Sequence, residues 1–359
     1  MKKKILKKTM ATMLSGVCVV SGVVIPTDTT YAGAGLGYWP EDLPVPNQYY
    51  YQNESLQPYG TCLQVGELKN WSPDNDPDAR YNRSAIPLQE RYMGPNVNPL
   101  ASRDAKIMPL AMSNARASEA PSQGGDGDFV YAFNNFQYVD TYNFWGGSSA
   151  EGPIAIPSPE HIDSAHRNGV MATGTIFIPW GDEAYGSQFV RELTEKDAQG
   201  NFPCADKLIE IAQYYGFDGY IFNAESGTGV AGFKEFLIYM QEKAPENFRI
   251  SWYNGRGTLN QGDIQSWMQD GEDRITDEWW LDMSGAGDVD STIDVAYGAD
   301  RDKWDIHSTW EYIPMEDGAK GGDYQARLDE DGKLKISLGI LAPTSTLTQS
   351  KNSDDFMNV

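Results

Sequence analysis

Strand-like and helix-like segments alternate along most of this chain, and this alternation limits the possible folds more than any other feature of the sequence. Short runs rich in β-branched and aromatic residues are followed by stretches with apolar residues at helical spacing, or by long connections. Strands joined in this way form a mostly parallel sheet that helices cover. The sequence therefore predicts an α/β protein.

Eight strands are predicted, and their connections are long enough to hold helices. Eight such units fit a (β/α)8 TIM barrel. The predicted strands are residues 106–111, 139–145, 170–178, 220–225, 248–253, 279–282, 293–298 and 335–341.

Helices are clearest around the third and fourth of these strands. One helix is expected from Pro159 to Gly169, before the third strand. Residues 205–215 carry apolar side chains at helical spacing, and the next helix, from Phe233, ends before Pro245. Because these stripes are apolar and aromatic, we expect them to pack in the core and not to bind a cofactor.

The fourth predicted strand ends in two polar residues. Side chains alternate along a strand, so Asn223 and Glu225 point the same way, roughly 6–7 Å apart at their Cα atoms. An amide and a carboxyl at the end of an apolar strand are costly to desolvate without a partner. They either cap a helix that begins near Ser226 and Gly227, or form a site at the carboxyl end of the barrel.

Aromatic side chains stand at the ends of several other predicted strands. Flat rings suit the C–H faces of sugars, although about half of these rings are expected to fill the barrel wall instead. Their arrangement around one carboxylate predicts a carbohydrate site. The residues expected to bind substrate are Trp145, Tyr185, Trp267, Trp280 and, after the seventh predicted strand, Asp300.

The run from Asp218 to Glu225 is similar to two glycosidase motifs. Chitinase-like enzymes carry DGxDxDxE, but here Ile221 and Asn223 replace two of its aspartates. The run resembles instead the GFDGxxxNxE strand of the family-85 endo-β-N-acetylglucosaminidases. The resemblance covers most of the mature chain, through residues 68–73, 138–142, 145–147 and 252–253.

This resemblance implies a mannosyl-glycoprotein endo-β-N-acetylglucosaminidase, which hydrolyses the GlcNAc-β1,4-GlcNAc core of the N-linked glycans of glycoproteins. In such a retaining enzyme the 2-acetamido oxygen of the sugar replaces a protein nucleophile and forms an oxazoline. The resemblance implies that Glu225 is the acid and base, that Asn223 accepts the acetamido N–H, and that Tyr253 hydrogen-bonds the acetamido group. Burial among aromatic rings would give Glu225 the raised pKa that a general acid needs.

Two alternatives remain open at this point. One is a chitinase-like hexosaminidase, but Ile221 and Asn223 depart from the chitinase motif and argue against it. The other is a non-catalytic glycan-binding surface protein built on a decayed barrel, against which the presence of Glu225 speaks. A glycosidase that uses two carboxylates would need a distant partner for Glu225, such as Asp282 or Asp300.

The first 34 residues are predicted to be a signal peptide. Residues 1–8 are basic, and residues 10–25 are mostly apolar but too short to span a bilayer comfortably. Ala32-Gly33-Ala34 offers a cleavage site, and an uncleaved anchor is the alternative. We therefore expect a secreted or cell-surface protein that is not inserted in a membrane after cleavage.

The rest of the chain divides into two predicted parts. Residues 35–104 are rich in Pro, Asn, Asp and Tyr with little periodicity, so we expect an irregular N-terminal extension. Residues 105–359 are expected to form the catalytic barrel. Because the chain ends soon after the eighth predicted strand, we expect the last helix and any accessory domains to be missing.

Composition excludes some partners. With 28 basic and 51 acidic residues the net charge is -23, so nucleic acid is not an expected partner. Cys62 and Cys204 form no redox or metal motif, and they either pair or are separately buried. We expect no metal or cofactor, because His161, His166 and His307 form no spaced cluster, and we expect a monomer.

Overall fold

The computed structural model describes the chain between residues 62 and 343, with gaps. The described residues all belong to one compact unit, Ala34–Val359, and are 62–76, 79–91, 93–94, 102–111, 133–146, 153–178, 180–283, 288–311, 324–341 and 343. The predictions about residues 1–34 and about the end of the chain lie outside these residues. Within them, no helix has both the length and the hydropathy needed to span a bilayer.

The main sheet closes on itself. It has ten strands in the described chain, of which β1 (Cys62–Leu63) and β4 (Ile154–Ala155) pair antiparallel to their neighbours. The other eight run parallel, and pairing of the last with the first closes a barrel. They are β2 (Ile107–Ala111), β3 (Thr141–Phe144), β5 (Met171–Ile178), β6 (Gly219–Ala224), β7 (Arg249–Tyr253), β10 (Glu278–Leu281), β11 (Ile306–Glu311) and β12 (Ser337–Leu341).

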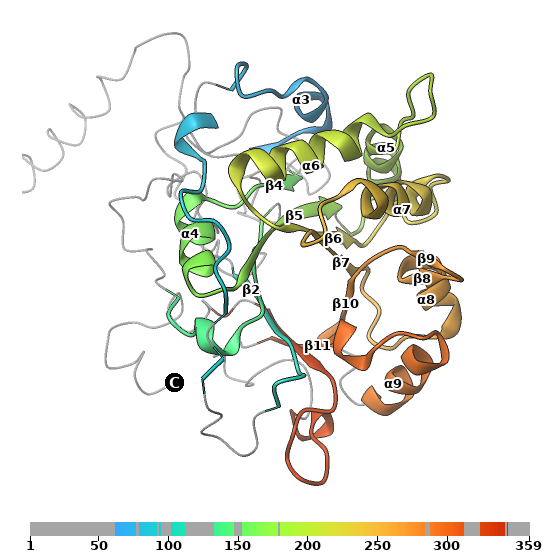
Figure 1. The fold of residues 1–359 in the computed structure, drawn as a ribbon. Coiled ribbons are helices and arrows are strands. Elements are labelled where there is room, and N and C mark those ends of the chain that lie inside the picture. The colour runs from blue at the N-terminus through green and yellow to red at the C-terminus, as the bar shows by residue number, and fades with distance from the viewer. Residues whose placement is uncertain are drawn as a thin grey trace, which may run out of the picture. The chain divides into compact units, whose positions relative to one another are not determined.

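Helices surround this barrel on the outside (Figure 1). They are α3 (Val65–Asn70), α4 (Pro159–Arg167), α5 (Glu183–Leu193), α6 (Pro203–Tyr215), α7 (Phe233–Lys243), α8 (Gln261–Trp267) and α9 (Val289–Gly298). Short 3₁₀ helices are η1 (Ala79–Tyr81), η2 (Phe136–Tyr138), η4 (Lys303–Asp305) and η5 (Tyr324–Arg327), and β8 (Gln269–Asp270) and β9 (Asp273–Arg274) form a small hairpin. The predicted (β/α)8 TIM barrel is confirmed.

Local sequence explains where the best-predicted helix begins and ends. Pro203 stands in the first turn of α6, where its missing N–H costs nothing. Gly216 ends the helix with a left-handed φ of 88°. Between them the apolar stripe of α6 is buried against the sheet, as predicted.

One predicted strand is wrong. Residues 293–298 belong to helix α9, and the seventh strand of the barrel is β11. The β-branched residues of this short window favoured a strand, but over the longer span Val289, Thr292 and Ala296 are buried at helical spacing. Strand β11 escaped prediction because polar side chains, including His307 and Thr309, fill its buried interior.

The segment before the barrel lies against α4 and α6. The Trp71 ring contacts Tyr214 and Tyr215 at centroid distances of 5.5 and 5.6 Å. The Ser84 hydroxyl donates to Asp163 Oδ1 of α4 over 2.7 Å. This segment therefore covers the helices on the outside of the barrel.

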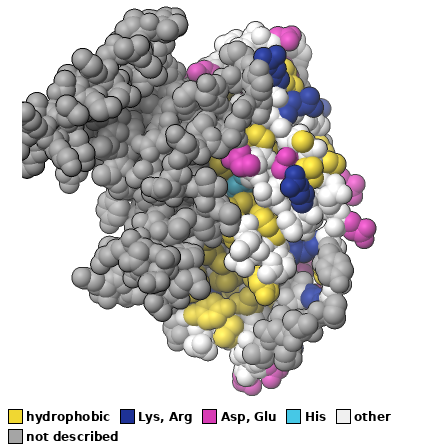
Figure 2. Space-filling view, turned by 90° about the vertical axis from the view of Figure 1, so that its left-hand side faces the viewer, with side chains coloured by type: hydrophobic (Ala, Val, Ile, Leu, Met, Phe, Trp, Pro, Cys, Tyr) yellow, Lys and Arg dark blue, Asp and Glu magenta, His cyan; other side chains and the backbone are white. Residues whose placement is uncertain are grey.

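Both signs of charge are present on the face drawn in Figure 2. Lys and Arg side chains lie among Asp and Glu side chains there, and the described residues of this face show no single basic patch.

Candidate active site

The end of β6 carries Asn223 and Glu225 on the face that points into the barrel. Phe222 points the other way, where its ring contacts Phe233 and Phe236 of α7. The Asn223 side-chain N–H donates to Glu225 Oε1 over 3.1 Å. The predicted orientation of this pair is therefore confirmed. Neither residue caps a helix, because the next helix, α7, begins only at Phe233, with Gly232 as its N-cap.

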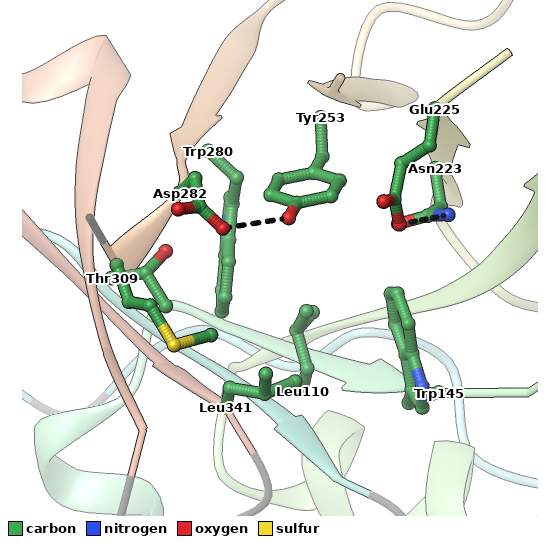
Figure 3. A pocket seen from close by; sticks show the side chains of 10 residues that line it. Leu110, Trp145, Asn223, Glu225, Tyr253, Trp280, Asp282, Thr309 and Leu341 are labelled. Carbon is green, nitrogen blue, oxygen red and sulfur yellow. Dashed lines mark hydrogen bonds between the residues drawn. The ribbon is translucent and has the colours of Figure 1, made fainter. Parts of the chain in front are cut away.

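These two side chains line a pocket at the carboxyl end of the barrel strands (Figure 3). Strands from around the barrel contribute to it, which is the usual arrangement of a TIM-barrel site. The lining residues are Leu110, Trp145, Asn223, Glu225, Tyr253, Trp280, Asp282, Met283, Thr309 and Leu341.

Five of the eight residues predicted for the site meet in this pocket. Asn223 lies in β6 and Glu225 directly follows it, Tyr253 ends β7, Trp280 lies in β10 and Trp145 follows β3. The Trp145 ring lies near the Glu225 carboxyl group, and the Trp280 ring lies near the Tyr253 phenol (Figure 3). A sugar ring in this pocket would therefore meet flat apolar surfaces beside polar groups.

Two of the predicted aromatic residues lie elsewhere. Trp267 stacks on Trp252 at a centroid distance of 4.4 Å and also contacts Phe233, so it packs between the barrel wall and α7. Tyr185 stacks on Phe189 within α5 and packs against the hydrophobic core. Neither residue lines the pocket. Sequence reasoning placed both near strand ends but could not tell which face of its element each occupies.

Asp300 was predicted to follow the seventh strand of the barrel, and the structure contradicts this premise. Asp300 follows helix α9, not a strand, and its side chain is exposed, with a left-handed φ of 56°. The helices run antiparallel to the strands, so this position lies at the end of the barrel opposite the pocket. The error follows directly from the strand wrongly predicted at residues 293–298.

The pocket also contains residues that were not predicted as substrate-binding. Asp282 follows β10 directly and accepts a hydrogen bond from the Tyr253 hydroxyl over 3.0 Å. It was considered only as a second carboxylate, although its place just after a strand was a usable indication. Thr309 was missed together with strand β11, and its buried hydroxyl has no hydrogen-bond partner among the described residues.

Electrostatics favour a protonated acid at Glu225. Burial raises the pKa of its carboxyl, the hydrogen bond from Asn223 lowers it, and the negative charge of Asp282 raises it, with a net rise. The Asn223 side chain is 1% exposed, and its Oδ1 has no hydrogen-bond partner in the described structure. The pocket thus offers one proton donor and, beside it, one free acceptor.

Asp218 and Gly219 hold β6 in place from its other end. Asp218 Oδ2 accepts the Ala172 amide over 2.8 Å and pairs with His166 of α4 over 2.7 Å. Gly219 has a φ of 135°, and a Cβ there would lie 1.9 Å from Arg249 O. These two residues of the Asp-Gly motif therefore support the strand and do not enter the pocket.

Asp140 and Tyr142, two polar residues of the second predicted strand, have structural contacts. Asp140 Oδ2 accepts the Ile107 amide over 2.9 Å, and Tyr142 stacks on His161 at 3.9 Å, both away from the pocket. Cys204 is a free, buried thiol.

In the described part of the chain, no three His, Cys, Asp or Glu side chains are grouped in a way that could hold a metal ion.

Comparison with known proteins agrees with this geometry. The model of glycosyl hydrolase family 85 matches residues 113–359. The chain belongs to glycosyl hydrolase family 85. The resemblance inferred from the Asn-x-Glu strand is thereby confirmed, and it places the chain among the glycoside hydrolases.

Solved and curated family-85 proteins show the same relationship. The glycoside hydrolase domain of Endo-D from Streptococcus pneumoniae R6 is 28% identical, with a TM-score of 0.70 over 85% of this chain and 50% of that one. A cytosolic endo-beta-N-acetylglucosaminidase of Danio rerio is 29% identical over 57% of this chain, and that of Homo sapiens is 24% identical over 61%. The match spans only 28% of the length of either curated relative.

These relatives contradict one prediction. We expected a secreted or cell-surface protein, but the matching proteins of Danio rerio, Mus musculus, Gallus gallus and Homo sapiens are named cytosolic. The expectation rested on the charge and hydropathy of residues 1–34 and on the small-residue cleavage site at their end. Such a pattern does not by itself distinguish a signal peptide from other N-terminal segments.

Proposed function

We propose that this family-85 protein is an endo-β-N-acetylglucosaminidase that cleaves the GlcNAc-β1,4-GlcNAc core of N-linked glycans. The observation that carries the proposal is the pairing of a half-buried acid, Glu225, with a buried amide, Asn223, whose oxygen has no hydrogen-bond partner in the described structure. The names of the matching relatives and of the Endo-D domain support the same activity.

The proposed first step uses the substrate's own acetamide as nucleophile. Its carbonyl oxygen bonds to the anomeric carbon while the glycosidic C–O bond breaks, and the Glu225 proton passes to the leaving oxygen. Asn223 Oδ1 accepts the acetamido N–H, which favours the imidic form of the group. The product is an oxazolinium ion whose N–H stays hydrogen-bonded to Asn223 Oδ1, with Glu225 now a carboxylate.

The second step reverses the roles. Glu225 takes a proton from water, the water oxygen bonds to the anomeric carbon, and the C–O bond of the oxazolinium ring breaks to restore the acetamide with its N–H. Tyr253 lies beside the acetamido group and limits its approach. Trp145 and Trp280 hold the sugar ring by stacking against its C–H faces.

A glycosylated ribonuclease tests this activity. We expect Glu225→Gln to release glycan about 10²–10⁴-fold more slowly, because the glutamine has no proton to give, while glycan binding persists. Mass spectrometry of the protein product would show a single remaining GlcNAc for the unaltered chain. Glu272→Gln is the matched control, since Glu272 is exposed and does not line the pocket. Unchanged glycan release by Glu225→Gln would reject the assignment.

A further inference from the structure

Tyr253 lies between the two carboxyl groups of the pocket. In Figure 3 its hydroxyl points to Asp282 on one side, and Glu225 lies on the other. The hydroxyl donates to Asp282 Oδ2 over 3.0 Å. The position of the phenol therefore depends on Asp282.

The strands fix Asp282 firmly with respect to Tyr253. Strand β10 pairs with β7 in a register that sets Trp280 opposite Tyr253, and alternation turns Asp282 to the same face as Trp280. The Asp282 amide also donates to Arg256 O over 2.7 Å, in the loop after β7. Two contacts thus tie Asp282 to the end of β7.

The charge of Asp282 acts on Glu225 across the pocket. No Lys, Arg or His is among the lining residues of the described chain, so no cation there offsets the charge. Outside the pocket, Arg256 pairs with Asp263 over 3.6 Å, and Glu183 accepts the Gly227 amide over 3.2 Å in the loop after β6. Repulsion by Asp282 adds to the effect of burial in raising the pKa of Glu225.

We propose that Asp282 is a positioning residue, which acts on the reaction by holding the Tyr253 hydroxyl in place and by its negative charge beside Glu225. This inference deepens the proposed function and rests on it for its kinetic consequences. A carboxylate suits both tasks, because it accepts a hydrogen bond from the phenol and carries a negative charge. The mechanism described above needs Tyr253 fixed and Glu225 protonated at the start of each turnover.

The charge effect can be measured without substrate. Carbon NMR of labelled glutamate side chains would follow the titration of Glu225, assigned by its absence in Glu225→Gln. We expect Asp282→Asn to lower the titration midpoint of Glu225, because the amide keeps an acceptor for Tyr253 but loses the charge. Asp273→Asn is the matched control, since Asp273 is exposed in the β8–β9 hairpin and should leave the midpoint unchanged. An unchanged midpoint in Asp282→Asn would overturn the charge effect.

The effect through Tyr253 is tested by a double-mutant cycle. At a pH below the Glu225 midpoint of every variant, we expect Tyr253→Phe and Asp282→Ala each to lower kcat about ten-fold, the loss of one hydrogen bond. The double variant should also lose about ten-fold, because both changes remove the same contact. A loss near a hundred-fold would show independent action and overturn the positioning role. If the unaltered protein released no glycan, the proposed function would fail, whereas the titration of Glu225 would still test Asp282.

Discussion

The oxygen of the Asn223 side chain is buried without a hydrogen-bond partner in the described structure. An unpaired buried acceptor typically costs about 1–3 kcal/mol, so its presence needs an explanation, and a catalytic role is one. The other end of the same amide donates to Glu225. One side chain thus serves both the acid and, in the proposed mechanism, the acetamido N–H.

This dual contact leads to a prediction with two substrates. Asn223→Ala should slow the cleavage of intact glycan about ten- to a hundred-fold, since one hydrogen bond in the transition state is lost. Hydrolysis of a supplied sugar oxazoline should continue near the unaltered rate, because the oxazoline has already formed. Steady-state rates on both substrates provide the measurement, and Asn168→Ala, at the end of α4, is the control. Equal losses on the two substrates would contradict the role given to Asn223.

At the scale of elements, helix α4 supports the strand that carries the site. His166 of α4 pairs with Asp218, which directly precedes β6. Burial lowers the pKa of His166, but the hydrogen bond and charge of Asp218 outweigh this, so the pKa is raised above its ordinary 6.5. A raised pKa in the folded state means that the charged pair stabilises the fold at low pH. This contribution is complete below 6.5 and is lost as the pH rises through the folded pKa.

The pH dependence of stability tests this pair. The free energy of unfolding of the unaltered chain should exceed that of His166→Gln by about 1–3 kcal/mol near pH 6. This difference should shrink toward pH 9. Urea unfolding at a series of pH values measures the difference. His161→Gln is the control in the same helix, because burial lowers the pKa of His161 to about 3 and it stays neutral over this range. A difference that grew with pH would contradict the assignment.

Elements also show the limits of prediction from local patterns. Helices α6 and α7 were predicted because long apolar stripes and clear end residues agree. Helix α9 and strand β11 were not, since a short β-branched window resembles a strand and a polar strand resembles a loop. Strand β11 was not recognised because its buried side chains include polar ones, such as His307 and Thr309, which the interior of the barrel accommodates.

At the scale of the whole molecule, closure of the barrel brings strands from opposite ends of the sequence together under the pocket. Strand β12 pairs with β2, and their neighbours β11 and β3 flank them. Gly339 of β12 leaves room for the Trp280 ring of β10, since a Cβ at this position would lie 2.9 Å from that ring. Trp280 is 1% exposed and lines the pocket, so one side chain takes part in barrel packing and, in the proposed mechanism, in substrate binding.

Filling this space should therefore affect both stability and binding. Gly339→Ala should destabilise the fold by about 1–3 kcal/mol through overpacking and raise KM by displacing the Trp280 ring. Thermal unfolding and steady-state kinetics measure the two effects. Gly298→Ala, at the end of α9 with nothing within 4 Å of its added Cβ, is the control and should change neither strongly. A stable Gly339→Ala variant with unchanged KM would contradict the proposed coupling.

Taken by itself, the sequence determined the α/β class and the orientation of Asn223 and Glu225, because these depend on periodicities of 2 and 3.6 residues within single segments. The number and alternation of these segments indicated a barrel. Only the tertiary structure decided which other side chains reach them. It brought Asp282 and Thr309 into the pocket, and it left Trp267, Tyr185 and Asp300 outside. The physical reason is that membership in the pocket depends on strand register and barrel closure. Both arise from pairing between residues far apart in the chain, which no local pattern records.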